Sequence, residues 1–307
     1  MKAIALLGPT CVGKTSASIL LAEHLSTEII GADSMQIYKG MDVGTAKPDA
    51  TERARVRHHM IDVVEPTCNY SAGEYLSRVS LIIEALTARG STPLVVGGTG
   101  LYVRAMSSGL FSAPAADWQF RHRLASIEEK KSGMLYRYLR RIDPAAARKI
   151  HPSDVKKTVR AIEVYVKSGK PISLLQSTGT RPLPYEFIKI ALYRDRQELY
   201  AMIERRVDEM LEGGLVGEAQ RLYPLGLART PMQAIGYKEV FAYIEGRCTL
   251  DESSASIKTA TRHYAKRQFT WFNKERDLHW VDVTGVVDPC RIFERIISKL
   301  RDINLKY

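Results

Sequence analysis

The residues Gly8-Pro9-Thr10-Cys11-Val12-Gly13-Lys14-Thr15 follow the pattern G-x-x-x-x-G-K-[ST], which is typical of a phosphate-binding loop, or P-loop. An apolar run at residues 3–7 precedes this stretch, and a helix-like run from Lys14 to about Leu25 follows it. In such a strand–loop–helix setting, backbone N–H groups and the start of the helix surround phosphate oxygens. We therefore expect residues 8–15 to bind a diphosphate or triphosphate, with Lys14 on its oxygens and the Thr15 hydroxyl on Mg²⁺.

The composition of the 307-residue chain is typical of a soluble globular protein. No apolar run approaches the roughly 18 residues of a membrane span, and no targeting peptide is visible, so we expect no membrane association. The four cysteines are scattered without a C-x-x-C pair, which indicates a reducing compartment and no zinc site. We expect a cytoplasmic, monomeric protein.

Positive charge is concentrated in one segment. The formal net charge is +11, and residues 121–170 hold fourteen Lys or Arg against five Asp or Glu. A solvated helical surface would account for part of this excess. A polyanionic partner accounts for it better, because each phosphate that a cation neutralises releases counterions. This segment therefore predicts contact with a nucleic-acid backbone.

Two further strand ends are predicted to lie near the P-loop. A short strand at 28–32 ends at Asp33, and the apolar strand at 93–96 ends in Gly97-Gly98-Thr99-Gly100, where small residues let a ligand approach the backbone. Ligands of open α/β sheets bind at the carboxyl ends of the strands, so we expect Asp33 beside the phosphates. An Asx-turn or a helix cap is the structural alternative for Asp33. Another short strand is expected at Met60–Val64.

The predicted fold is α/β, with a P-loop NTPase-like parallel sheet flanked by helices and an inserted all-helical domain. Ala113-Pro114-Ala115-Ala116 marks the start of the insertion, because the pattern beyond it is helical and basic. A largely apolar run typical of a strand returns at 187–192. We assign residues 1–113 and 186–307 to the core domain and residues 114–185 to the basic insertion.

The residues alone leave the reaction open. A kinase would carry a carboxylate after a buried strand to hold its metal, yet the strand at 93–96 ends without an acid. Asp33 could supply that carboxylate. A P-loop kinase of a small metabolite and a non-catalytic RNA-binding protein both remain alternatives at this point.

Seven blocks in chain order resemble the tRNA dimethylallyltransferase family, and they span nearly the whole chain. They are Gly8–Thr15, Gly31–Tyr38, Met41–Pro48, Gly97–Tyr102, Arg160–Val164, Ile235–Glu239 and Tyr264–Phe272.

The resemblance implies transfer of a dimethylallyl group from dimethylallyl diphosphate to N6 of adenosine 37 in the anticodon stem-loop of a tRNA. It implies that Asp33 hydrogen-bonds N6 and takes up its proton. It also implies that Gly13, Lys14 and Mg²⁺ on Thr15 stabilise the leaving diphosphate. Thr10 matches the family's position for contact with the donor. An enzyme that acts on free adenine nucleotides is a third possibility, but it would not need the basic insertion.

The resemblance also implies a set of residues that contact tRNA. They are Asp33, Ser34, Met35, Gln36, Thr99, Arg121, Lys156, Lys157, Thr158, Val159 and Arg160. Two positions depart from the family. Lys156-Lys157 stands where the family usually has Gln-Arg, so a planar guanidinium is lost there, and Met202 stands where members often carry an arginine.

Overall fold

The computed structural model describes residues 2–303, which form two compact units. Unit 1 comprises the chain up to Ser107 and from Pro184 onward, and unit 2 comprises Ser108–Leu183. The division falls at Ser108 and Pro184, where the sequence pattern suggested residues 114 and 186.

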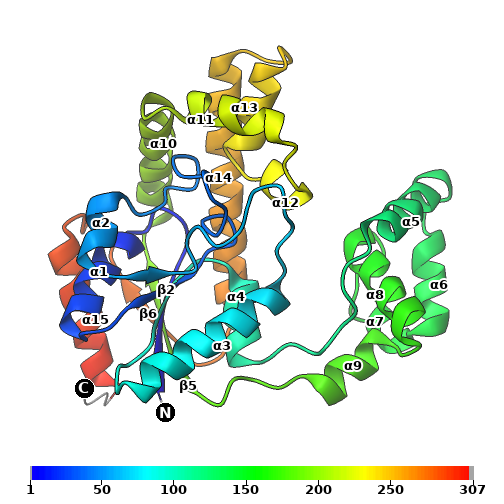
Figure 1. Ribbon diagram of the computed structural model, residues 1–307, viewed down its shortest axis with the longest axis horizontal. Coiled ribbons are helices and arrows are strands. Elements are labelled where there is room, and N and C mark those ends of the chain that lie inside the picture. The colour runs from blue at the N-terminus through cyan, green and yellow to red at the C-terminus, as the bar shows by residue number, and fades with distance from the viewer. Residues whose placement is uncertain (1, 304–307) are drawn as a thin grey trace. The chain divides into compact units, whose positions relative to one another are not determined.

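Unit 1 is built on a parallel sheet of six strands in the order β3-β2-β4-β1-β5-β6. Figure 1 shows the chain with β2, β5 and β6 labelled. The strands are β1 (Lys2–Leu7), β2 (Ile29–Ala32), β3 (His58–His59), β4 (Leu94–Gly97), β5 (Glu186–Tyr193) and β6 (Leu278–Asp282). All five residues of β1 from Ala3 to Leu7 are buried, as expected for a central parallel strand with helices on both faces. The observed sheet confirms the predicted α/β class.

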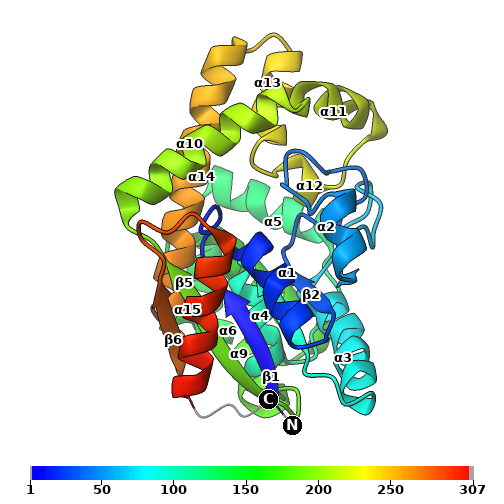
Figure 2. The same ribbon diagram turned by 90° about the vertical axis from the view of Figure 1, so that its left-hand side faces the viewer.

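Helices cover both faces of this sheet. In Figure 2, α1 (Lys14–His24) and α15 (Pro289–Asp302) lie in front of the strands, and α4 (Gly100–Ser107) and α14 (Leu250–Phe272) lie behind them. The remaining helices of unit 1 are α2 (Ala50–Arg55), α3 (Ala72–Ala88), α10 (Arg196–Glu212), α11 (Leu215–Leu222), the 3₁₀ turn η1 (Tyr223–Leu225), α12 (Arg229–Met232) and α13 (Tyr237–Ile244). No helix in the described part of the chain is both long and apolar enough to cross a membrane.

The largest apolar cluster joins the sheet to these helices. It includes Ile4 and Leu6 of β1, Leu199 of α10 and Ile292 of α15. A second cluster packs α10, α11, α13 and α14 around the chain that follows β2, with Tyr38 and Tyr237 fully buried. The second cluster holds the segment after β2 close to helices that come more than 150 residues later.

One predicted strand is wrong. The segment Met60–Val64 is a loop, and β3 consists of His58–His59. The backbone φ angles of Met60 and Asp62 are 63° and 54°, values that no extended strand allows. Lys47 stabilises this loop, since its ammonium group donates to Asp62 Oδ1 at 2.6 Å.

Unit 2 is helical, as expected for the insertion. Its helices are α5 (Trp118–Lys130), α6 (Met134–Ile142), α7 (Pro144–Ala147), α8 (Val155–Ser168) and α9 (Ile172–Gly179). Leu139 of α6 and Val164 of α8 are fully buried in its apolar core. The unit therefore has a core of its own.

Candidate active site

The P-loop lies between the carboxyl end of β1 and the start of α1. Gly8 and Gly13 have φ angles of 145° and 105°, which side chains other than glycine rarely adopt. Gly13 is the N-cap of α1, and no side chain caps the helix. The first N–H groups of α1 are therefore not used by a side-chain cap, which suits an anion at this end of the helix.

Lys14 folds back over the loop. Its ammonium group donates to Gly8 O at 2.9 Å and to Pro9 O at 2.6 Å. Burial lowers the pKa of Lys14 to about 8; the negative charge of Asp33 opposes this shift, and the positive charge of Arg206 adds to it. A bound diphosphate would offset the cost of burying this cation, because an anion nearby favours the charged form.

Asp33 follows β2 directly and begins a turn. Its Oδ1 accepts hydrogen bonds from Met35 N at 2.8 Å and Gln36 N at 3.3 Å. This is the Asx-turn geometry that was the structural alternative for Asp33. The turn uses only Oδ1 and leaves Oδ2 for another partner. Asp33 can therefore form the turn and also accept a hydrogen bond from a ligand.

The turn after β4 is joined closely to the end of β2. A Cβ on Gly97 would lie 2.2 Å from Ala32 O, and a Cβ on Gly98 would lie 2.2 Å from Gln268 Nε2. Thr99 Oγ1 accepts from Ser34 N at 3.1 Å. The sequence pattern predicts that these glycines admit a ligand. A side chain at either position would meet protein atoms, yet both glycines line the polar cavity beside the P-loop, where a ligand can approach their backbone.

Two adjoining cavities open where these segments meet. A polar cavity of about 310 Å³ lies against the P-loop and Asp33. A more apolar cavity of about 290 Å³ lies against Asp33 and the helices α10 and α14. The residues that line both are Thr10, Cys11, Asp33, Thr45, Arg206 and Tyr264. Asp33 therefore lines both the polar cavity beside the P-loop and the more apolar cavity next to it.

Arg206 of α10 is a site residue that motif reasoning missed. It lines both cavities, and its Nη1 lies 3.5 Å from Cys11 Sγ of the P-loop. Met202, one helical turn earlier, lines the polar cavity. Arg206 therefore places a guanidinium close to the position where the family often has its arginine. The only signal in the sequence was the pair Arg205-Arg206 on an amphipathic helix.

Tyr264 and Gln268 come from α14 and lie in the block Tyr264–Phe272 that resembles the family. Burial raises the pKa of Tyr264, and the charge of Asp33 raises it further, so its hydroxyl keeps its proton at neutral pH. Gln268 is buried and hydrogen-bonds the P-loop. Nothing in their spacing distinguishes these residues from those of an ordinary packed helix.

The predicted tRNA-contacting run after Asp33 lies around the same cavities. Ser34 and Met35 line the apolar cavity, and Gln36 lines the polar one. The Gln36 amide donates to Thr45 O and Ala46 O at 3.1 Å each, so it also holds the following loop in place.

In unit 2, two of the predicted tRNA-contacting arginines pair with a buried carboxylate. Glu163 is fully buried, and it accepts hydrogen bonds from Arg121 Nε at 3.0 Å, Arg121 Nη2 at 2.7 Å and Asp117 N at 2.6 Å, as well as from Arg160. Burial raises the pKa of Glu163, but the bonds from Arg121 and the other donors outweigh burial, and the net shift is downward. Arg121 and Arg160 therefore support the fold of the unit.

The other residues of α8 that were predicted to contact tRNA differ in their exposure to solvent. Thr158 and Val159 are buried, whereas Lys156 and Lys157 are exposed.

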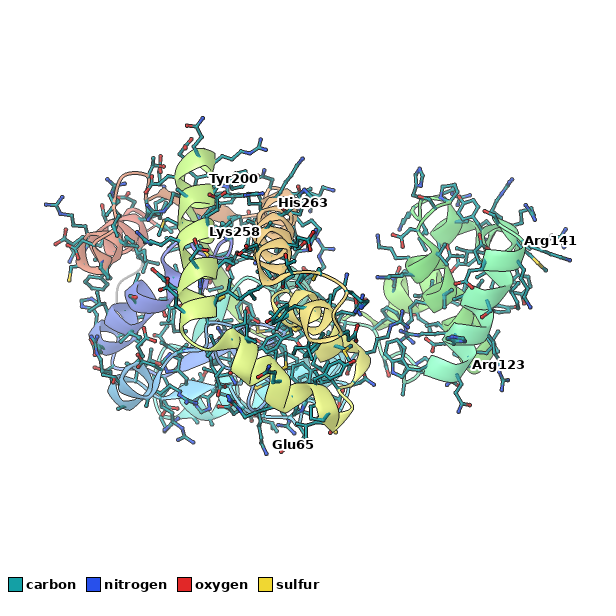
Figure 3. All side chains as sticks on the ribbon, turned by 90° about the horizontal axis from the view of Figure 1, so that it is seen from above. Glu65, Arg123, Arg141, Tyr200, Lys258 and His263 are labelled. Atoms are coloured by element: carbon teal, nitrogen blue, oxygen red, sulfur yellow. The ribbon has the colours of Figure 1, made fainter. Side chains whose placement is uncertain are left out.

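Twelve of the fourteen Lys and Arg side chains between 121 and 170 are exposed, and Arg123 and Arg141 project from the unit in Figure 3. Two of the five acids, Asp143 and Glu163, are buried. The accessible surface of unit 2 is therefore even more basic than its sequence.

The residues at the polar cavity fit Mg²⁺ that arrives with a diphosphate. Thr15 supplies a hydroxyl and Asp33 a carboxylate to the lining of that cavity. The described residues contain no cluster of three or more His, Cys, Asp or Glu side chains that could hold a metal ion. Most ligands of such an ion would then be phosphate oxygens and water, which Mg²⁺ favours.

Comparison with known proteins identifies the family. A family model described as IPP transferase matches residues 36–275. The tRNA dimethylallyltransferase of Thermodesulfovibrio yellowstonii is 49% identical over 309 residues and covers 98% of both chains. That of Symbiobacterium thermophilum is 44% identical, covering 97% of this chain and 95% of its own.

Solved structures agree with the sequence relatives. The full-length tRNA isopentenylpyrophosphate transferase of Bacillus halodurans aligns with a TM-score of 0.70 at 38% identity, covering 99% of this chain and 98% of that one. A eukaryotic dimethylallyltransferase acting on tRNA aligns with a TM-score of 0.81 at 29% identity, covering 99% of this chain and 80% of that one. The chain is therefore a member of the IPP transferase family.

Proposed function

We propose that this protein transfers a dimethylallyl group from dimethylallyl diphosphate to N6 of adenosine 37 in tRNA. The observation that supports this most directly is the pair of cavities that share Asp33, Thr10, Arg206 and Tyr264. One cavity suits a diphosphate, and the other suits an apolar group and a flat base. The relatives reported above are transferases of the same reaction class.

In the proposed reaction the allylic C1–O bond breaks and the N6–C1 bond forms. Diphosphate leaves with the electron pair of the broken bond, and N6 loses one proton. The P-loop N–H groups, Lys14 and Arg206 would hold the charge that develops on the leaving group. Mg²⁺, when bound, would neutralise further charge on the phosphate oxygens. Asp33 would accept the hydrogen bond from N6 and then its proton.

The tRNA would reach this site with adenosine 37 turned out of its stack. The exposed cations of unit 2 would hold the phosphates of the anticodon stem-loop. Lys156 and Lys157 are proposed to contact RNA directly. Arg121, Arg160, Thr158 and Val159 would act by shaping the unit, since Glu163 pairs the two arginines and the other two side chains are buried. A cytoplasmic, monomeric enzyme is part of this proposal.

A kinase is disfavoured. The names of the relatives specify prenyl transfer, and β4 ends in glycine where a kinase would carry a metal-binding acid.

The test is incubation with isotopically labelled dimethylallyl diphosphate and unmodified tRNA. Label should appear on adenosine 37 and should require Mg²⁺. A folded protein that leaves the tRNA unlabelled would contradict the proposal, and label on free adenosine monophosphate alone would assign a different acceptor.

A further inference from the structure

Gln268 of α14 joins two segments of the active site that are far apart in sequence. Its side-chain oxygen accepts from Thr10 N of the P-loop at 2.9 Å, and its side-chain nitrogen donates to Gly98 O of the turn after β4 at 3.0 Å. We propose that Gln268 is a positioning residue, which sets where the donor diphosphate lies relative to Asp33. This inference rests on the proposed function.

Glutamine is the side chain that meets both requirements. One end of the amide accepts and the other donates, and the two partners are a backbone N–H and a backbone C=O. An ionised carboxylate of the same shape could not donate to Gly98 O, and an isosteric methionine could satisfy neither partner. Gln268 is 5% exposed and lines the polar cavity, so removing its amide would leave Thr10 N and Gly98 O without this side-chain partner at the cavity wall.

The turn after β4 is shaped to receive this side chain. A Cβ on Gly98 would lie 2.2 Å from Gln268 Nε2 and 3.2 Å from Gly8 O. Gly98 is not in the left-handed region, so space rather than backbone conformation requires glycine here. The missing side chain lets Gln268 reach the P-loop and the β4 turn together.

The hydrogen bond from Thr10 N to Gln268 is most important when a ligand binds to the P-loop. In this structure Lys14 holds Gly8 O and Pro9 O, and Gln268 holds Thr10 N. The Lys14 ammonium has three N–H donors, and a diphosphate would compete with these two carbonyl oxygens for them. The bond from Thr10 N to Gln268 does not involve Lys14, so it would hold the loop in either case.

A chain of hydrogen bonds continues from Gln268 to the segment that carries Asp33. Gly98 precedes Thr99, whose backbone N–H donates to Ala32 O at 3.1 Å and whose Oγ1 accepts from Ser34 N at 3.1 Å. These bonds flank Asp33 on both sides. Through them, the position of the P-loop is tied to the position of the carboxylate that would receive the N6 proton.

The experiment compares Gln268→Met and Gln268→Glu with the wild type in the full-length protein. The readouts are kcat and KM for dimethylallyl diphosphate at saturating tRNA, the Kd of inorganic pyrophosphate with Mg²⁺ by calorimetry, and Tm. Gln220→Met is the matched control, because Gln220 is exposed on α11 and lines neither cavity.

For Gln268→Met we expect kcat to fall about 10²-fold, as a misplaced reacting group does, with a weaker Kd for pyrophosphate and an unchanged Kd for tRNA. Gln268→Glu should weaken pyrophosphate binding more than Gln268→Met, because its carboxylate adds negative charge beside the polar cavity. Gln220→Met should match the wild type in every readout.

A lower Tm with wild-type kcat and wild-type pyrophosphate affinity would assign Gln268 a purely structural role and overturn the inference. If Gln268→Met does not fold, Gly98→Ala provides the second test, because its methyl group displaces the Gln268 amide without removing it. Wild-type values in Gly98→Ala would also overturn the inference. Pyrophosphate binding does not depend on transfer, so a wild-type protein that fails to prenylate tRNA would refute the proposed function separately.

Discussion

The P-loop of unit 1 and the helical surface of unit 2 are both positively charged, but their cations lie in different environments. Lys14 is buried enough for its pKa to fall to about 8, and Arg206 lies close by on a cavity wall. Unit 2 instead carries twelve exposed Lys and Arg side chains between residues 121 and 170. Partly buried cations on a cavity wall interact strongly with one fixed anion, whereas exposed cations interact weakly with many phosphates and are screened by salt.

Because of this difference in environment, we propose different roles for the P-loop site and for the surface of unit 2. The P-loop site would act on a small diphosphate through a few strong, oriented interactions. Unit 2 would hold a long polyanion through many interactions that are individually replaceable. Substitutions in the two regions should therefore differ in size and in salt dependence.

The largest effect is expected at Asp33. Asp33→Asn keeps an oxygen for the turn to Met35 and Gln36 but removes the base, so kcat should fall by about 10²–10⁴. Asp33→Ala should lose the same activity and also lower Tm, because the turn loses its acceptor. Single-turnover transfer and calorimetry would measure both. Full activity in Asp33→Asn would show that Asp33 only shapes the turn.

A smaller effect is expected from Lys14, and it should depend on pH. Wild-type affinity for pyrophosphate should fall as the pH rises through the Lys14 pKa of about 8, because the neutral amine binds an anion less well. Lys14→Met should bind weakly at low pH and lose most of this dependence. Lys156→Met, in unit 2, should keep the wild-type pH profile. Identical pH profiles for the wild type and Lys14→Met would refute this role of Lys14.

A still smaller effect is expected from the paired substitution Lys156→Ala and Lys157→Ala. Affinity for tRNA should fall several-fold, and the slope of log K against log salt should become shallower by about 0.7–0.9 for each phosphate that the protein no longer neutralises. The kcat at saturating tRNA should stay the same. A salt slope equal to that of the wild type would show that α8 does not contact the RNA backbone.

The smallest effect is expected at Thr158, which the family resemblance places among the tRNA contacts. Thr158 is 1% exposed, and its hydroxyl has no hydrogen-bond partner in the described part of the chain. Thr158→Val should leave tRNA affinity unchanged and Tm unchanged or slightly raised, because no hydrogen bond is removed. Filter binding and calorimetry would detect any larger change, which would point to a direct RNA contact.

Local patterns predicted part of the site well. The spacing of glycines and Lys14 after an apolar strand is enough to specify a P-loop, because the loop is built from neighbouring backbone groups. The position of Asp33 at a strand end predicted its place beside that loop, and Lys14 and Asp33 both line the polar cavity.

Other parts depend on packing between distant segments. Arg206 reaches the site because α10 packs beside α14, and Gln268 reaches Thr10 across 258 residues of sequence. Counting charges in residues 121–170 did not show that Arg121 and Arg160 pair with a buried Glu163. The segment Met60–Val64 looked like a strand until the positive φ angles of Met60 and Asp62 excluded it.

By itself, the sequence determined the phosphate-binding loop, the parallel α/β class and the basic helical insertion. These follow from short-range spacing, the burial of apolar runs and net charge, all of which can be read along the chain. The tertiary structure decided which distant side chains complete the candidate site, and which cations of the insertion are exposed. Those outcomes depend on packing between elements far apart in the chain, which no local pattern specifies.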